Sequence, residues 1–292
     1  MADNESSLSH LVLLRRRQIS EQGTNILNAF ARGMQPATPE TTAEAARQLD
    51  DCCPPLERKE EVHNYLWTVW EIMLDTARSP DVSDEIQERL VSILESLRLY
   101  AKGDLDVWGS KCRVWRDLPL LPMCMESYFN DPSSETGEFT PESAQIWRKL
   151  NTFAARCLAS GTIGTYYQAM YALRLALEEE LSAVLKVYIT ECRIQVACAW
   201  MAYGAKPLLW WAKENIGMMD VIEADTANYV ERGALYHGPA TMCLRRWGFW
   251  LDRFEELGKE ESGMSEGCRK AAVEAALIMK TVEKGTAHTL TA

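Results

Sequence analysis

Apolar residues recur at helical spacing along most of this chain of 292 residues. The clearest stripe advances in alternating steps of three and one and consists of Val62, Tyr65, Leu66, Val69, Trp70, Met73 and Leu74. The next segment, from Ile86 to Tyr100, repeats this pattern. Such steps place side chains on one face of an α-helix, and few stretches alternate with the period of two that a strand requires. The sequence therefore predicts an all-α protein.

Residues that cap or stop helices divide this pattern into elements. Thr38 and Thr140 each precede a proline and a glutamate, which supply a capping hydroxyl, a residue suited to the first turn and an acid that meets the helix dipole. Glycines after apolar runs mark helix ends, as at Gly103 and Gly161. We predict about nine to eleven helices, over residues 8–32, 39–50, 56–78, 81–102, 118–129, 141–160, 165–181, 182–204, 207–216, 240–258 and 265–284.

The polar stretch Asn130–Phe139 is the most obvious exposed loop and could divide two lobes. The apolar faces on both sides are too large to be buried separately, so we predict a single bundle-like domain over residues 1–292. Three segments are expected to lie outside the regular helices: frayed ends at about 1–7 and 285–292, and a lid or irregular connection at 218–239.

Charge and composition exclude several classes of protein. The formal charge of −11 and the pI near 5.0 argue against nucleic acid, because phosphate contacts need a clustered basic surface. The longest apolar run, Val196–Ala205, is too short for the roughly 20 residues of a membrane helix, so no membrane insertion is expected. The start, Met1–Ser9, does not resemble a secretory signal. Nine cysteines, an odd number without a CxxC pair, indicate reduced thiols in a cytoplasmic protein.

No motif of a cofactor or metal enzyme is present. The chain lacks GxSxG, GxGxxG, GxxxxGK[ST] and HExxH. This argues against the common α/β-hydrolases, dinucleotide-binding proteins, P-loop NTPases and zincin metalloproteases. Glu60 and His63 have the spacing of one half of a di-iron site, but no second Glu-x-x-His exists. Asp50–Asp51 lacks the third acid that a magnesium-dependent terpene synthase would need. We therefore expect neither a cofactor nor a metal.

Ten tryptophans are the strongest anomaly of the composition. Five of them lie on predicted apolar faces and are expected to pack in the core: Trp70, Trp147, Trp200, Trp247 and Trp250. Trp67 lies off the main stripe, with His63 four residues before it and Glu71 four residues after it. If this row faces a cavity, it offers a flat apolar wall between an acid and a base; if it faces solvent, Trp67 is simply exposed.

Further polar and aromatic residues leave similar alternatives open. Tyrosines at the start of the predicted helix 165–181 could hydrogen-bond a ligand or pack at the helix end. Arg174 and Glu178 can pair on one helix face, either as a buried ion pair or as a pair that lines a cavity. Asn151 needs hydrogen-bond partners if it is buried, and Glu191 and Arg193 raise the same question inside a strongly apolar helix.

These considerations define two sets of candidate residues, both expected around a hydrophobic small molecule. The candidate catalytic residues are Tyr171, Arg174, Asn151, His63 and Glu71. The candidate substrate-binding residues are Trp67, Trp115, Tyr166, Tyr167, Trp200, Tyr203 and Trp211. A homodimer is also a hypothesis, because Trp210–Trp211, Met218–Met219 and the last predicted helix offer apolar surface.

Four blocks of the chain resemble an ascomycete fungal family known as domain of unknown function three-six-three-two. In their helical context they span roughly residues 55–260, and they read WRDLP at Trp115–Pro119, WRKLNTFAARC at Trp147–Cys157, ALRLALEEE at Ala172–Glu180 and RWGFWLDRF at Arg246–Phe254. The resemblance implies an α-helical protein of filamentous fungi, often encoded near pathways of secondary-metabolite biosynthesis. It implies no set of catalytic residues.

Two functions from different classes follow. The first is a cofactor-independent tailoring enzyme, a cyclase or isomerase, that acts on a hydrophobic terpenoid or polyketide in an aromatic-lined pocket; its specific form is a [4+2] pericyclase such as a Diels-Alderase. The second is a helical interaction or scaffold protein without chemistry. A pocket of several hundred cubic ångströms with convergent polar groups would favour the enzyme, and a solid core would favour the scaffold.

Overall fold

The computed structural model describes residues 20–34, 39–100, 102–134, 139–180, 187–214 and 230–288. The chain divides into two compact units, Met1–Asp131 and Pro132–Ala292. The division falls inside the predicted exposed loop Asn130–Phe139, although Asp131 and Pro132 are themselves buried. The prediction of one domain stays a prediction. The all-α fold class is confirmed, since the described residues contain ten α-helices beside one small hairpin.

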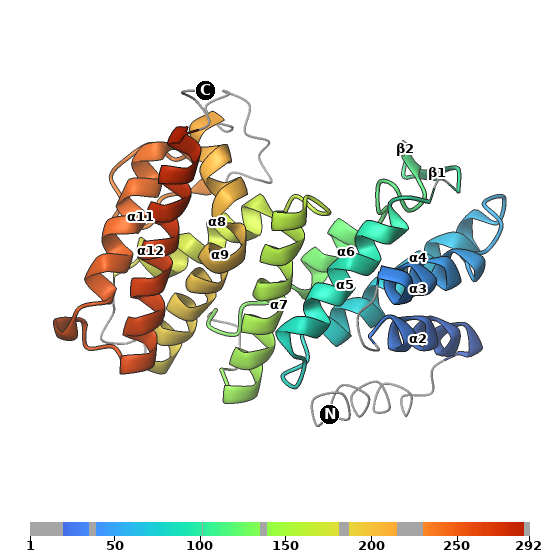
Figure 1. Cartoon of the computed structure of the whole chain (residues 1–292), viewed down its shortest axis with the longest axis horizontal. Helices are drawn as coiled ribbons and strands as arrows, with labels where there is room; N and C mark the ends of the chain where they lie inside the picture. Colours follow the sequence, from blue (N-terminus) through green and yellow to red (C-terminus); the bar gives the residue numbers. More distant parts are fainter. Residues whose placement is uncertain are drawn as a thin grey trace. The chain divides into compact units, whose positions relative to one another are not determined.

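The first unit is built from five described helices and a hairpin (Figure 1). Helix α2 packs on α3 and α4, α3 packs on α5, and α4 packs on α6. The predicted stripe from Val62 to Leu74 is fully buried and makes α4 the central helix of this core. The elements are α2 (Glu21–Gly33), α3 (Pro39–Asp51), α4 (Lys59–Ala77), α5 (Asp84–Leu97), β1 (Asp104–Val107), β2 (Ser110–Arg113) and α6 (Leu121–Tyr128).

The hairpin of β1 and β2 was not predicted, and α5 ends at Leu97 rather than at residue 102. The two strands are antiparallel, and Val107 pairs with Ser110 across a two-residue turn. Both turn residues have a positive φ, 48° at Trp108 and 86° at Gly109, as a tight hairpin turn requires. Strands of four residues are too short to give a visible period of two, so the sequence pattern could not indicate them.

The loop between β2 and α6 holds three non-glycine residues in the left-handed region: Trp115 at φ 71°, Leu118 at 46° and Leu120 at 69°. Each such residue costs on the order of 1–3 kcal/mol. All three side chains are buried, and Trp70 of α4 donates a hydrogen bond from Nε1 to the carbonyl oxygen of Pro119, 2.8 Å away. Burial and this hydrogen bond together hold the loop in its strained conformation.

The second unit is organised around one long helix (Figure 1). Helix α9 contacts α7, α8, α11 and α12, and α11 also packs on α12. The elements are α7 (Pro141–Ser160), α8 (Tyr166–Leu177), α9 (Val187–Glu214), α11 (Leu244–Leu257), the short 3-10 helix η1 (Glu260–Ser262) and α12 (Glu266–His288). Helix α12 extends to His288, four residues beyond the predicted helix end at residue 284, and residues 1–7 and 289–292 of the predicted frayed ends lie outside the described residues.

The bounds of α7 agree with the prediction, whereas the break predicted at Pro207 was wrong. Thr140 accepts a hydrogen bond from the Ser143 amide, 3.0 Å away, in a reciprocal capping box, and Gly161 ends α7 with a φ of 69°. The described parts of the predicted helices 182–204 and 207–216 form one helix, α9, with Pro207 in its interior. A proline removes one helical hydrogen bond, but the residues beyond it, including Leu208 and Trp211, are buried and keep the helix continuous.

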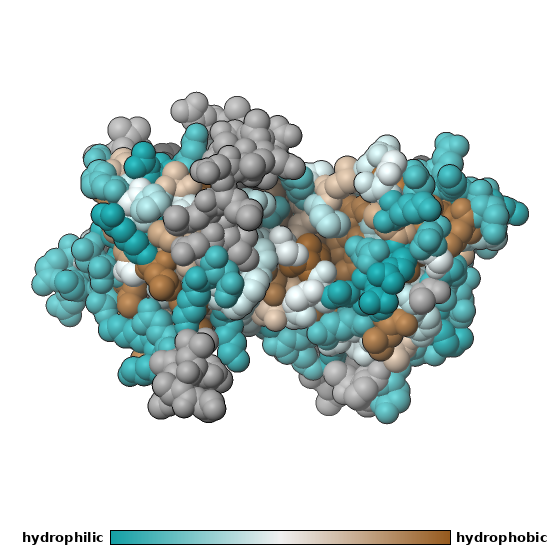
Figure 2. Space-filling view, turned by 90° about the horizontal axis from the view of Figure 1, so that it is seen from above, coloured by the Kyte–Doolittle hydropathy of each residue, from teal (hydrophilic) through white to brown (hydrophobic). Residues whose placement is uncertain are grey.

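The surface of the molecule is mixed in character. Figure 2 shows hydrophilic residues over much of one face, with smaller hydrophobic patches between them. None of the described helices combines the length and the apolar composition that a membrane-spanning helix needs.

Candidate functional site

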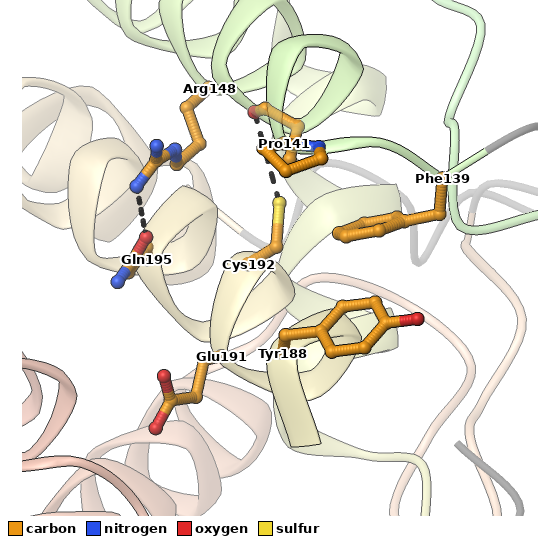
Figure 3. Close-up of a pocket in the computed structure, with 8 residues that line it drawn as sticks. Phe139, Pro141, Arg148, Tyr188, Glu191, Cys192 and Gln195 are labelled. Atoms are coloured by element: carbon orange, nitrogen blue, oxygen red, sulfur yellow. Dashed lines mark hydrogen bonds between the residues drawn. The ribbon is translucent and has the colours of Figure 1, made fainter. Parts of the chain in front are cut away.

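A pocket of about 360 Å³ lies between α7 and α9 in the second unit (Figure 3). Its first wall begins with Phe139, just before the capping box of α7, and continues with Pro141, Ala144 and Arg148. The three residues of α7 are spaced at i, i+3 and i+7, so they lie on one face of the helix. The cap at Thr140 fixes the first turn of α7, and it thereby fixes the place of this wall.

The second wall is one face of the first turns of α9. Tyr188, Glu191, Cys192 and Gln195 are spaced at i, i+3, i+4 and i+7, which is the arrangement of a single helical stripe. This stripe mixes an aromatic ring, a carboxylate, a thiol and an amide. The pocket therefore combines apolar and polar groups in a volume that suits a small organic molecule.

One end of the pocket is aromatic. The rings of Phe139 and Tyr188 lie one above the other in Figure 3, with their centroids 5.2 Å apart and their planes at 35°. Tyr188 is 48% exposed, so its ring faces solvent as well as the pocket. Two tilted rings in contact provide flat apolar surfaces for another ring or a conjugated chain.

The other end of the pocket is polar. Arg148 donates a hydrogen bond from Nη1 to Oε1 of Gln195, across from α7 to α9 (Figure 3). Among the described residues, no carboxylate forms an ion pair with Arg148, and its partner is this neutral amide. A guanidinium has five N–H donors, so most of the donors of Arg148 remain for another group.

Cys192 and Glu191 occupy the middle of the pocket wall. Cys192 is buried, and its Sγ lies 3.9 Å from the carbonyl oxygen of Ala144. Glu191 accepts a hydrogen bond at Oε1 from the backbone N–H of Ser265, 2.6 Å away, directly before the start of α12. In Figure 3 its carboxylate points away from Arg148 and the aromatic pair. Glu191 thus connects the pocket wall to a third helix.

The predicted row of His63, Trp67 and Glu71 lies in the first unit as one half-buried face of α4. Trp67 donates a hydrogen bond from Nε1 to Oε1 of Glu71, 3.0 Å away. His63 places Nε2 3.2 Å from the carbonyl oxygen of Asp106 in β1, and its ring centroid lies 6.5 Å from that of Trp108. The acid and the imidazole therefore both have partners within the protein.

Three of the other candidates are fully buried. Trp115 has no exposed surface and donates from Nε1 to Oδ1 of Asp50 at 2.7 Å. In the second unit, Trp200 donates from Nε1 to Oδ1 of Asn151 at 2.9 Å, and the Asn151 amide donates to the carbonyl oxygen of Trp147 at 2.9 Å. These contacts satisfy the polar groups that the sequence singled out, so we leave all three residues out of the proposed site.

Three predicted aromatic residues do come together. Trp211 is buried, and its ring contacts those of Tyr166 and Tyr167, with centroids 5.1 Å and 6.1 Å away. Burial raises the pKa of Tyr166. Tyr203 has a different partner, Arg156. Its hydroxyl accepts a hydrogen bond from Arg156 at 2.8 Å, and the guanidinium of Arg156 lies over its ring. We refer to Tyr166, Tyr167 and Trp211 as the tyrosine cluster.

The pair predicted between Arg174 and Glu178 is not formed, which corrects that part of the sequence analysis. Glu178, fully buried, binds Arg246 of α11, with 2.6 Å between Oε1 and Nε and 2.8 Å between Oε2 and Nη2. Arg174 instead places its Nη1 3.6 Å from Oε1 of Glu179. The Cζ atom of Arg174 lies 5.8 Å from the ring centroid of Tyr171. The ion pair that ties the helices together thus joins two sequence blocks far apart in the chain.

Glu178 and Arg246 also hold the described end of the predicted lid. Trp250 donates from Nε1 to Glu178 at 2.7 Å, and the Gly233 amide donates to its second oxygen at 3.0 Å. Arg246 donates to the carbonyl oxygens of Val230 and Glu231. The residues from 230 onwards are therefore fixed to α8 and α11, whereas residues 218–229 of the predicted lid lie outside the described residues.

The large indoles belong to the cores rather than to the pocket. The fully buried members, Trp70, Trp115, Trp200, Trp247 and Trp250, each donate a hydrogen bond to a protein oxygen. Neither a tryptophan nor any residue of the two candidate sets lines the described pocket. Glu191, noted in the sequence as a charge inside an apolar helix, is the pocket residue that the pattern did single out.

The described residues also contain no group of three His, Cys, Asp or Glu side chains close enough to hold a metal ion. Comparison with known proteins finds no curated protein and no solved structure that matches the chain. A protein family does match, over residues 70–254, which include all four blocks named above. Because this match covers more than half of the chain, the protein belongs to the family described as a protein of unknown function, DUF3632.

Proposed function

We propose that this protein binds a small amphipathic organic molecule in the pocket between α7 and α9. One observation carries the proposal: a cavity of about 360 Å³ has the aromatic pair Phe139 and Tyr188 at one end and Arg148 at the other. Pockets for small molecules are mostly apolar, occupy about 300–1,000 Å³ and hold a few well-placed polar groups. The rings would bind the apolar part of the ligand, and the guanidinium would bind its polar group.

We further propose that binding serves a cofactor-independent cyclisation or isomerisation of a terpenoid or polyketide, in the tailoring of a secondary metabolite. A [4+2] cyclisation converts three π bonds into two σ bonds and one π bond within the substrate, so no electron acceptor or leaving group is required. The pocket would hold the substrate in a folded conformation. Arg148 is the donor that we assign to a carbonyl of the substrate, because it lines the pocket and Tyr171, Arg174 and Asn151 do not.

A non-catalytic interaction protein is the second candidate. The observation that favours it is that the fully buried indoles are packed with their N–H groups satisfied, while Trp108 and Trp210 are 68% and 52% exposed. Exposed tryptophans are frequent anchors of protein interfaces. This candidate includes the homodimer predicted from Trp210, and it expects no ligand in the pocket.

Calorimetric binding of conjugated probes separates the two candidates. We expect 4-biphenylcarboxamide or 4-biphenylcarboxylate to bind the wild type, and we expect binding to be lost in Tyr188→Ala, which removes an aromatic wall, and in Gln195→Trp, which fills the cavity. Tyr167→Ala is the matched control, because Tyr167 is also an exposed tyrosine but lies in the tyrosine cluster. Loss of binding in Tyr167→Ala alone would move the site to that cluster, and the absence of any binding would favour the interaction protein.

The catalytic part of the proposal has its own readout. Cyclisation and isomerisation leave the molecular mass unchanged, so linear conjugated terpenoid and polyketide precursors should give products of equal mass and new chromatographic mobility. Arg148→Met should lower the rate and leave the protein folded. If the wild type binds such precursors at the pocket and never alters them, the protein is a binding protein and not an enzyme.

A cytoplasmic location is also proposed. All nine cysteines are free thiols, which agrees with a reducing compartment. Cell fractionation of the tagged full chain tests this, and recovery from the secreted fraction would contradict it.

A further inference from the structure

Within the described part of the chain, no carboxylate balances the charge at the polar end of the pocket. Arg148 is half-buried, and the partner of its guanidinium among the described residues is the neutral amide of Gln195. Arginine stays protonated at every relevant pH, and its planar fork of donors matches a carboxylate. Gln195 orients the guanidinium through one nitrogen, Nη1. The other donors are then available to an anionic group of the ligand.

Glu191 also lines the pocket and would repel such an anion, but its charge is directed elsewhere. Its Oε1 accepts the Ser265 N–H at 2.6 Å, at the beginning of the 23-residue helix α12. The start of a helix carries a partial positive charge that stabilises a carboxylate. In Figure 3 the Glu191 carboxylate lies beyond Gln195 as seen from the Arg148 guanidinium. The positive charge of Arg148 therefore dominates its own end of the pocket.

The distance between the two ends limits the length of the ligand. Tyr188 and Gln195 are seven residues apart on α9, which is two turns or about 10 Å along the helix axis. Pro141 and Arg148 are separated by the same two turns on α7. A molecule with a ring at one end and a carboxylate about 10 Å away would contact Phe139, Tyr188 and Arg148 at once.

We propose that the pocket ligand is an aromatic or conjugated carboxylic acid, with its ring against Phe139 and Tyr188 and its carboxylate on Arg148. This inference rests on the proposed function, since it names the class of molecule that the same pocket takes. The buried Cys192 lines the pocket between the two ends (Figure 3), and its sulfur offers an apolar contact to the middle part of the molecule.

A matched pair of probes tests the carboxylate separately from the ring. The probes 4-biphenylcarboxylate and 4-biphenylcarboxamide have the same shape and differ in charge. We expect the acid to bind the wild-type protein about 10-fold tighter or more at pH 7, because a charge-assisted hydrogen bond exceeds a neutral one by roughly this factor. The advantage of the acid should shrink as salt is added.

Variants at Arg148 locate the effect. Arg148→Met should bind the two probes equally, and Arg148→Lys should keep part of the preference for the acid, because it retains the charge and loses the planar fork. Arg193→Met is the matched control: Arg193 is also a half-buried arginine bound to a neutral group, Ser133 Oγ at 2.9 Å, and it does not line the pocket. It should bind both probes as the wild type does.

The outcomes distinguish failure of the carboxylate inference from failure of the pocket as a binding site. Equal affinity of acid and amide in the wild type, with both lost in Tyr188→Ala, would overturn the carboxylate inference and leave the pocket as the binding site. A preference for the acid that survives Arg148→Met, or that disappears in Arg193→Met, would also overturn it. If neither probe binds up to millimolar concentration, the pocket is not a binding site and both proposals fall.

Discussion

Replacing Glu178 by glutamine should destabilise the second unit strongly. The carboxylate is fully buried and receives four hydrogen bonds: two from Arg246, one from Trp250 and one from the Gly233 amide. Glutamine has almost the same shape, but its amide nitrogen would face these donors and its charge is gone. The buried guanidinium of Arg246 would then lose its counter-ion.

Two separate arguments give a similar value for the free energy of unfolding that Glu178→Gln loses. Hydrogen bonds that involve a charged group contribute about 1.5–3 kcal/mol each, and the Glu178→Gln change weakens both bonds from Arg246. Removal of one partner of a buried ion pair costs about 3–5 kcal/mol. We therefore expect a loss of about 3–5 kcal/mol in the free energy of unfolding, a large part of the 5–15 kcal/mol typical of a folded domain.

Urea unfolding followed by circular dichroism and tryptophan fluorescence measures this loss. Glu180→Gln is the matched control, because Glu180 lies two residues away and is exposed, and it should leave the unfolding midpoint unchanged. The double variant Glu178→Leu, Arg246→Met should be more stable than Glu178→Gln, since it leaves no buried charge. A loss below about 1 kcal/mol for Glu178→Gln would refute the reasoning, because the pair would then not hold the unit together.

Three further predictions concern packing and thiol chemistry. Gly233→Ala would place its Cβ 2.6 Å from the end of α8, so thermal unfolding should show a loss of about 1–3 kcal/mol; Gly248→Ala in α11 meets no atom within 4 Å and should be neutral or stabilising. Trp70→Phe removes the hydrogen bond to the strained loop and should cost about 1–3 kcal/mol in the same assay. Burial raises the pKa of Cys53 to about 11, and the thiolate is the reactive form. At pH 8 iodoacetamide should therefore modify the exposed Cys52 first, and modification of Cys53 should increase as the pH approaches 11; mass spectrometry of the digested protein would contradict this if Cys53 reacted as fast at pH 8.

The sequence predicted helices well where local signals agree with tertiary packing. The Thr140 cap and the left-handed Gly161 define the two ends of α7, and both residues are local signals that predict helix ends. The break expected at Pro207 was wrong because burial of the residues that follow it outweighs one missing hydrogen bond. Helix ends set by short strands, as after Leu97, carry no periodic signal at all.

The pocket could not be predicted from the sequence because it depends on which two helix faces meet. The stripes of Arg148 on α7 and Gln195 on α9 are each visible as helical patterns, but their contact joins residues 47 positions apart. The number of tryptophans did not indicate a cavity. Buried indole N–H groups find acceptors inside the core, as Trp200 does in the side-chain oxygen of Asn151, so these rings need no cavity. The charge of Glu191 inside an apolar helix was the informative signal, and the structure pairs this carboxylate with the Ser265 amide.

The hydrogen bond between Glu191 and the Ser265 amide makes the Ser265 amide a reporter of pocket occupancy. A molecule in the pocket that shifts the Glu191 side chain must lengthen or release that contact, although Ser265 itself does not line the cavity. The nuclear magnetic resonance signal of this one backbone amide, and its rate of exchange with deuterated solvent, would then respond to occupancy of the pocket. Filling of the cavity could be followed in this way without labelling either the ligand or the cavity wall.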